Sequence, residues 1–360
     1  YQATVQGRIV PALRRLLQVI EHEALPAARD SAGYGALPDG AAWYRRLVRD
    51  QTTTELEPEA VHALGLQEVA RIETELARVA PRLGYGGDAR GLLTWVRSNP
   101  AFLPFRSDEQ VLQRYREIQA RAAAALPQLF GRLPKAPLEI RPEPALTKAT
   151  ASDHYALPAD DGSRPGIYWA VIDDPVAYDA TGMVALFLHE ALPGHHLQMA
   201  LQQEMHTLPA FRRRAWINAF GEGWALYAET LGQEMGLYED PAAWVGELRM
   251  EIMRAARLVV DTGLHAKGWS REQAMAYWMD KVGATEAQAK NQIERYMAWP
   301  AQALGYKIGA LKIQALRERA RQRLGPRFRL ADFHDAVLGQ GSLPLSVLEA
   351  QIERWIARQQ

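Results

Sequence analysis

Apolar residues recur every three or four positions through most of this 360-residue chain, and this spacing is the strongest constraint on its fold. Such a spacing puts apolar side chains on one face of an α-helix, whereas a half-buried strand requires strict alternation. The segment after Pro58 is an example, with Val61, Leu64, Val69, Ile72, Leu76 and Val79 in one stripe. Helices are predicted at residues 6–23, 58–79, 91–97, 108–126, 181–204, 212–235, 241–267, 270–282, 286–296 and 301–324, with a last one from Pro344. The sequence therefore predicts a mainly α fold.

The middle of the chain has a different character. Residues 135–178 are rich in Pro, Gly and Asp, and segments 138–141 and 166–172 contain strand-forming residues. We predict a small sheet or hairpin just before the helix that starts near residue 181. The strand at 166–172 has two interpretations: an edge that pairs with an extended peptide, or a buried structural strand.

Charge and cysteine content exclude several functions. Lys and Arg total 42 and Asp and Glu total 42, so the chain lacks the basic surplus of a nucleic-acid-binding protein. No apolar run approaches the roughly 20 residues of a membrane span. The absence of cysteine excludes disulfides, thiolate zinc sites and a cysteine nucleophile. Any metal site must therefore consist of His, Asp and Glu.

A His-Glu pair ends the apolar run 183–188 and is followed by Pro193, Gly194 and two more histidines. In the pattern His-Glu-x-x-His, two histidines bind Zn²⁺ and the Glu takes a proton from the attacking water. Here Pro193 stands where the second His would be, and a regular helix would point His195 away from His189. A break at Pro193–Gly194 would let either His195 or His196 reach the metal. A surface His-Glu pair without a metal is the alternative.

A second segment, 220–229, offers a third ligand. Catalytic zinc sites commonly combine two histidines with a carboxylate. Glu222 lies between two glycines that permit close approach of another backbone, and we interpret it as that carboxylate rather than as a solvated helix-end residue. Glu229 lies seven residues later on the same helix face and is predicted to orient one of the histidines.

Residues 189–198 resemble the His-Glu-x-x-Pro-Gly-His-His-x-Gln signature of the bacterial "domain of unknown function 885" family. Further segments resemble this family over nearly the whole chain: 52–58, 62–66, 165–169, 222–229, 260–265 and 302–309. The family is similar to helical zinc peptidases of the thimet oligopeptidase and carboxypeptidase Taq type. The resemblance implies a large helical zincin-like metallopeptidase body with the small sheet beside the active-site helix.

The resemblance also implies roles for individual residues. His189 and Glu222 match metal ligands of one Zn²⁺ ion, and Glu190 matches the general base. His195 matches the second His ligand better than His196, because Gly194-His195 corresponds to the Gly-His of the peptidases. Tyr306 occupies a place similar to the late catalytic Tyr near the substrate oxyanion, the alternative being a packed tyrosine.

The sequence context of three further residues makes them candidates for contact with the substrate. His265 lies late on an apolar helix and is predicted either to help stabilise the oxyanion or to be a satisfied core histidine. Arg254 and Arg257 would either clamp a substrate carboxylate or form ion pairs.

The predicted organisation is one helical catalytic unit over residues 1–360, divided into N-terminal helices (1–134), a β-containing insert (135–180) and metal-site helices (181–360). Because the chain opens at Tyr1 without Met and family members are usually longer, we expect a C-terminal portion of a longer protein, in the periplasm or the cytoplasm.

The function predicted from these residues is zinc-dependent hydrolysis of peptide bonds in short peptides. A metal-dependent amidase acting on a non-peptide amide is one alternative. A non-catalytic helical binding protein on the same scaffold is another, but the chain retains His189, Glu190, His195 and Glu222.

Overall fold

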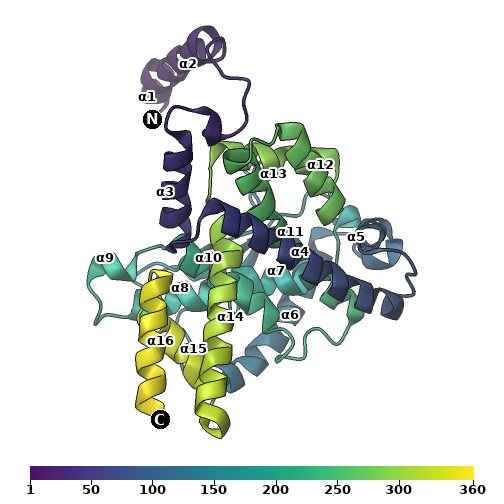
Figure 1. The fold of residues 1–360 in the computed structure, drawn as a ribbon, viewed down its shortest axis with the longest axis vertical. Coiled ribbons are helices and arrows are strands. Elements are labelled where there is room, and N and C mark those ends of the chain that lie inside the picture. The colour runs from purple at the N-terminus through teal and green to yellow at the C-terminus, as the bar shows by residue number, and fades with distance from the viewer.

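The structure, a computed structural model, describes residues 1–360 and is mainly helical (Figure 1). Its N-terminal part contains the helices α1 (Gln2–Thr4), α2 (Val10–Val19), α3 (Gly40–Thr52), α4 (Pro58–Val79), α5 (Ala89–Ser98) and α6 (Asp108–Leu129). Then come the strands β1 (Leu138–Pro142), β2 (His154–Ala156) and β3 (Gly166–Ala170). The remaining helices are α7 (Met183–Glu190), α8 (His195–Glu204), α9 (Ala210–Arg213), α10 (Asn218–Thr230), α11 (Pro241–Ala266), α12 (Arg271–Val282), α13 (Glu286–Ala298), α14 (Leu304–Leu324), α15 (Leu330–Leu338) and α16 (Leu345–Gln359). The prediction of a mainly α chain with a small sheet is confirmed.

Four elements lie in segments for which no element was predicted: the three-residue helix α1, the helices α3 and α15, and the strand β2. Strand β2 is only three residues long, so its alternation is too short to be recognised. The predicted helix 181–204 is divided into α7 and α8, as the Pro193–Gly194 pair indicated.

The sheet has the order β1–β3–β2, with β1 parallel and β2 antiparallel to β3. Because β3 is the central strand and pairs on both sides, the interpretation of residues 166–172 as a free peptide-binding edge is wrong. Its side chains are largely buried, which favours the structural alternative. The strand beside the candidate site that has a free edge is β2.

Residues 2–24 form a helical rod that stands away from the rest of the molecule (Figure 1). The predicted helix at 6–23 is present, but its apolar stripe is not packed on the core. Leu13, Leu16 and Leu17 are each more than half exposed. The hydrophobic core lies instead in the body, where α4 packs along α11 and α10 packs along α14.

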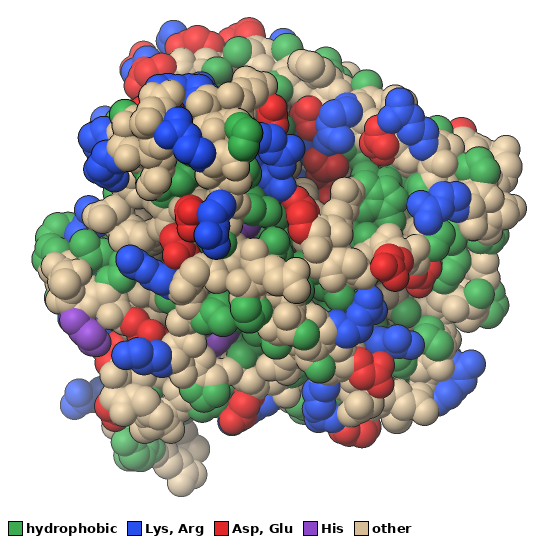
Figure 2. All heavy atoms as spheres, turned by 90° about the horizontal axis from the view of Figure 1, so that it is seen from below, with side chains coloured by type: hydrophobic (Ala, Val, Ile, Leu, Met, Phe, Trp, Pro, Cys, Tyr) green, Lys and Arg blue, Asp and Glu red, His purple; other side chains and the backbone are tan.

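No helix is both long enough and apolar enough to cross a membrane. On the face shown in Figure 2, acidic and basic side chains are interspersed, without a large area of one sign. This distribution agrees with the balanced composition of the chain.

A buried histidine joins α15 to α6 and α10. The His334 Nδ1 atom donates to the Leu129 carbonyl oxygen (2.8 Å), and its Nε2 atom accepts from the Tyr227 hydroxyl (2.8 Å). Each nitrogen of the neutral ring therefore takes part in one hydrogen bond. Burial lowers the pKa of His334 from 6.5 to about 3.

We expect this histidine to make the protein less stable in mild acid. Below pH 6.5 the unfolded chain binds a proton at His334 that the folded chain does not bind. The free energy of unfolding should therefore fall with decreasing pH, by up to about 1.4 kcal/mol per pH unit for this one group. Urea unfolding at several pH values would measure the slope. A His334→Gln variant, which keeps a donor and an acceptor, should show a shallower slope, and equal slopes would contradict the prediction.

Candidate metal centre

The helix that carries the His-Glu pair ends immediately after it. Helix α7 stops at Glu190, and α8 begins at His195 after the break that Pro193 and Gly194 introduce. A Cβ atom on Gly194 would lie 1.9 Å from the His189 carbonyl oxygen, so only glycine fits this turn. The Trp224 indole N–H donates to the Pro193 carbonyl oxygen (2.9 Å) and ties the break to α10. The break brings His195 back towards His189.

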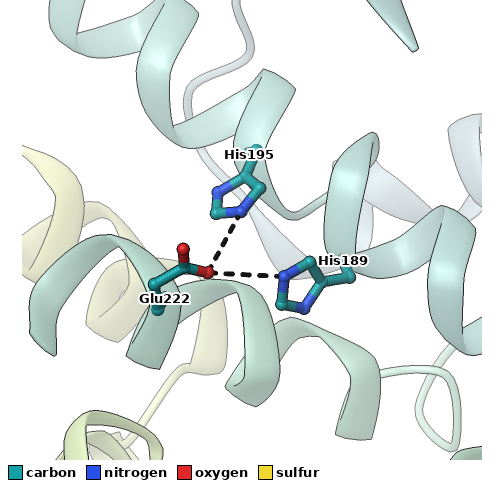
Figure 3. A group of neighbouring side chains, drawn as sticks. All are labelled: His189, His195 and Glu222. Carbon is teal, nitrogen blue, oxygen red and sulfur yellow. Dashed lines mark ion pairs between the residues drawn. The ribbon is translucent and has the colours of Figure 1, made fainter. Parts of the chain in front are cut away.

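Three side chains converge at this break: His189 from α7, His195 from α8 and Glu222 from α10 (Figure 3). The Glu222 Oε2 atom lies 3.5 Å from His189 Nε2 and 3.4 Å from His195 Nε2. One ligand atom of each residue lies within 4.8 Å of the other two. The structure thus brings together the three residues that the sequence indicated as metal ligands.

The spacing of the three atoms fits a zinc ion. Four ligands at about 2.1 Å from one ion are separated by about 3.4 Å along each edge of the tetrahedron. Glu222 Oε2 is also buried without a hydrogen-bond partner, which is costly for a carboxylate unless a cation completes the site. Two imidazoles and one carboxylate form the donor set of catalytic zinc sites.

Glu229 orients the first imidazole. His189 Nδ1 donates to Glu229 Oε1 at 2.7 Å, which leaves the lone pair of Nε2 directed towards Glu222. Glu229 is fully buried, and its charge is balanced by Arg254, whose Nη2 atom lies 3.4 Å from Oε1. Of the two interpretations of Arg254, the structure therefore favours an ion pair.

His196 points elsewhere. Its Nδ1 atom lies 3.0 Å from the Tyr155 hydroxyl on β2, and burial lowers its pKa to about 4. A neutral His196 thus connects the start of α8 to the sheet. Between the two alternatives for the second imidazole, the structure places His195, and not His196, beside Glu222.

Glu190, Tyr306 and the three converging residues line one cavity of about 740 Å³. Burial raises the pKa of Glu190 to about 8, and the nearby His195 opposes this shift. The Tyr306 ring stacks on the His189 ring, with 6.3 Å between centroids and 11° between planes. Two of the three predicted catalytic side chains, Glu190 and Tyr306, are therefore adjacent to the convergence point.

The orientation of Tyr306 depends on its neighbour in α14. The Lys307 Nζ atom is buried between Glu68 (2.8 Å) of α4 and Glu251 (2.5 Å) of α11. Adjacent helical residues point about 100° apart, so this ion pair turns Tyr306 towards the cavity. The glycines that flank Tyr306 allow α14 to pack closely against α10: a Cβ atom on Gly309 would lie 1.9 Å from the Ala219 carbonyl oxygen.

His265 does not line the cavity. Its Nδ1 atom accepts from the backbone N–H of Tyr34 (3.1 Å), and its Nε2 atom donates to the Tyr296 carbonyl oxygen (3.0 Å). The ring is fully buried and both nitrogens are engaged, so His265 cannot reach a substrate oxyanion. The predicted catalytic role of His265 is therefore wrong. The alternative is correct: His265 is a core histidine whose two ring nitrogens both have hydrogen-bond partners.

Other residues of the cavity were not predicted. They come from the loop and strand around β2, from the segment before α10 and from α13: Asp153, His154, Tyr155, Trp216, Gln292 and Arg295. None belongs to a motif with an obvious chemical role, and only the tertiary structure brings them to the site.

Comparison of the sequence with the profiles of known families shows which family the chain belongs to. Residues 1–352 match the sequence profile of a family described as "Bacterial protein of unknown function (DUF885)". The chain belongs to the DUF885 family. The family resemblance inferred from the motifs is thereby confirmed, whereas the further similarity to the thimet oligopeptidase and carboxypeptidase Taq type stays a hypothesis.

Two solved structures are similar to this DUF885 chain. A "putative lipoprotein" from Colwellia psychrerythraea has 40% sequence identity and a TM-score of 0.95, and the match covers 99% of this chain and 62% of that one. A "putative lipoprotein of unknown function" from Shewanella oneidensis has 20% sequence identity and a TM-score of 0.78. This match covers 96% of this chain and 63% of that one. The chain thus spans about three fifths of the length of each. Comparison with curated proteins gives no match.

Proposed function

We propose that this DUF885 chain is a zinc-dependent hydrolase of peptide bonds in short peptides, built as a helical zincin-like body. The observation that carries the proposal is the convergence of His189 Nε2, His195 Nε2 and Glu222 Oε2 beside the buried Glu190. The motif similarity to helical zinc peptidases adds to it, although a shared fold alone would not establish an activity.

Each residue has a defined part in this proposal. His189, His195 and Glu222 hold the zinc ion, and Glu229 keeps His189 in the tautomer that can bind it. When bound, zinc polarises the scissile carbonyl and acidifies water. Glu190 accepts the proton of the attacking water and passes it to the leaving amine. Tyr306 supplies a hydroxyl donor for the oxyanion.

The cavity volume supports a small substrate. A space of about 740 Å³ lies within the range of small-ligand pockets, roughly 300–1,000 Å³, and accommodates a short peptide rather than a folded protein. Strand β2 has a free edge and contributes His154 and Tyr155 to the lining of this cavity. An extended peptide could pair with that edge.

Metal analysis combined with a peptide digest tests the proposal. We expect about one zinc ion per chain by mass spectrometry of the metal, and cleavage products from a mixed pool of short peptides. A folded, metal-free protein would favour the non-catalytic binding protein. A zinc-containing protein that cleaves only non-peptide amides would favour the amidase.

A further inference from the structure

One wall of the cavity contains a buried arginine without a counter-ion. Arg257 of α11 lines the cavity together with Glu190 and Tyr306, and only 6% of its surface is exposed. Its Nε atom donates to the Tyr296 hydroxyl (3.0 Å), and its guanidinium carbon lies 4.5 Å from the centroid of the Tyr306 ring. Its Nη1 atom is buried and has no hydrogen-bond partner.

The acidic residues of the cavity lie too far from this guanidinium to form an ion pair with it. Arg257 forms no ion pair with any carboxylate of the chain within 4.0 Å. Glu222 faces the two imidazoles, and Glu229 pairs with Arg254. A buried guanidinium without an anion carries a large desolvation cost, which its contacts with two tyrosines offset only in part. An anionic group bound in the cavity would offset this cost.

Tyr306 links the arginine to the metal centre. Its ring centroid lies 4.5 Å from the Arg257 guanidinium carbon and 6.3 Å from the centroid of the His189 ring. These two contacts keep the guanidinium carbon within about 11 Å of the His189 ring centroid, roughly the span of three extended residues. An anion bound by Arg257 would thus lie up to a few residues from the bond that is cleaved.

We propose that Arg257 binds the C-terminal carboxylate of the peptide substrate, so that this chain cleaves near the carboxyl end and releases fragments of one to three residues. The proposal rests on the proposed function. A carboxylate matches the planar guanidinium and is the anion that every unmodified peptide carries at that end. In the reaction, the oxygen of water bonds to the scissile carbonyl carbon, the carbon–nitrogen bond breaks, and a water proton passes to the nitrogen of the released fragment.

Paired peptides test this proposal on the unaltered protein. Each pair has one sequence and ends either in a free carboxylate or in an amide. We expect kcat/KM for the free acid to exceed that for the amide by on the order of 100-fold, because one charge-assisted hydrogen-bonded pair is lost. Acetylation of the peptide amino end should have little effect. Mass spectrometry should identify C-terminal fragments of one to three residues as the first products.

Substitution of the arginine should remove this preference. In Arg257→Gln, the ratio of kcat/KM for the free acid to kcat/KM for the amide should fall from about 100 to about one, whatever the absolute rate of the variant. Arg257→Lys should keep part of the preference, since it keeps the charge but loses the planar fork. Arg90→Gln is a matched control, because Arg90 forms an exposed ion pair with Asp280 and neither residue lines the cavity. Circular dichroism and zinc content verify that the Arg257 variants are folded.

A binding measurement separates the two proposals. Calorimetric titration of the Glu190→Gln variant with the same peptide pairs should show tighter binding of the free acid, even if no cleavage is detected. Cleavage of acid and amide at equal rates would overturn the assignment of Arg257 and leave the hydrolase intact. If neither cleavage nor a difference in binding occurs, both proposals fail. If the Arg257 variants do not fold, the ratio of kcat/KM for the free acid to that for the amide in the unaltered protein tests the proposal.

Discussion

Replacement of Glu190 by Gln is expected to lower the turnover of a peptide substrate by about 10²- to 10⁴-fold, the usual contribution of a positioned general base. Glutamine has nearly the same shape and can still form hydrogen bonds, but it cannot take up the proton of the attacking water. Glu190 is buried and lines the cavity beside His189 and His195, where it can reach a water bound between them. Steady-state kinetics on one short peptide would measure the effect.

Zinc content distinguishes loss of the base from loss of the site. Glu190 is not one of the three converging ligands, so Glu190→Gln should retain zinc at the level of the unaltered protein. Glu294→Gln is a suitable control, because that carboxylate belongs to an exposed ion pair with Arg271. Unchanged turnover in a zinc-containing Glu190→Gln protein would show that Glu190 is not the base.

The second large effect is expected from the two adjacent histidines. His195→Ala should abolish stoichiometric zinc binding, because it removes one of three protein ligands. His196→Ala should retain zinc, since the His196 ring faces Tyr155 and not Glu222. Both substitutions delete a buried imidazole of the same helix, so the pair controls for general destabilisation.

Metal analysis after dialysis and thermal unfolding with added zinc would measure this difference. A ligand that binds only the folded state stabilises it by about 4 kcal/mol at a thousandfold excess over Kd, so zinc should raise the Tm of the unaltered protein and of His196→Ala. It should leave the Tm of His195→Ala nearly unchanged. Zinc retention by His195→Ala and loss by His196→Ala would reverse the assignment of the second imidazole.

Which side chains come together was predicted correctly where their positions depend on residues close in the sequence. Pro193 and Gly194 indicate a break, and the structure has one, because neither residue can continue α7 in the required geometry. Glu222 and Glu229 lie seven residues apart on α10, and both point to the histidines because seven residues are close to two helical turns.

The prediction failed where a residue's partners are distant in sequence. His265 has the sequence context of a functional histidine, but the Tyr34 backbone, 231 residues earlier, occupies its Nδ1 atom. The strand 166–172 was recognised, but its place in the middle of the sheet depends on β2, whose three residues have no pattern of their own. The stripe of residues 9–20 forms a helix, yet periodicity alone does not say whether another element covers it.

Sequence by itself determined the helical class, the break after Glu190 and the residue types able to hold zinc, because each depends on neighbours within two turns of a helix. Only the tertiary structure decided which of two histidines meets Glu222, which strand has a free edge, and that Arg257 is buried in the cavity without an anion. These depend on how α7, α8, α10 and α11 pack, and packing is a property of contacts between segments far apart in the chain.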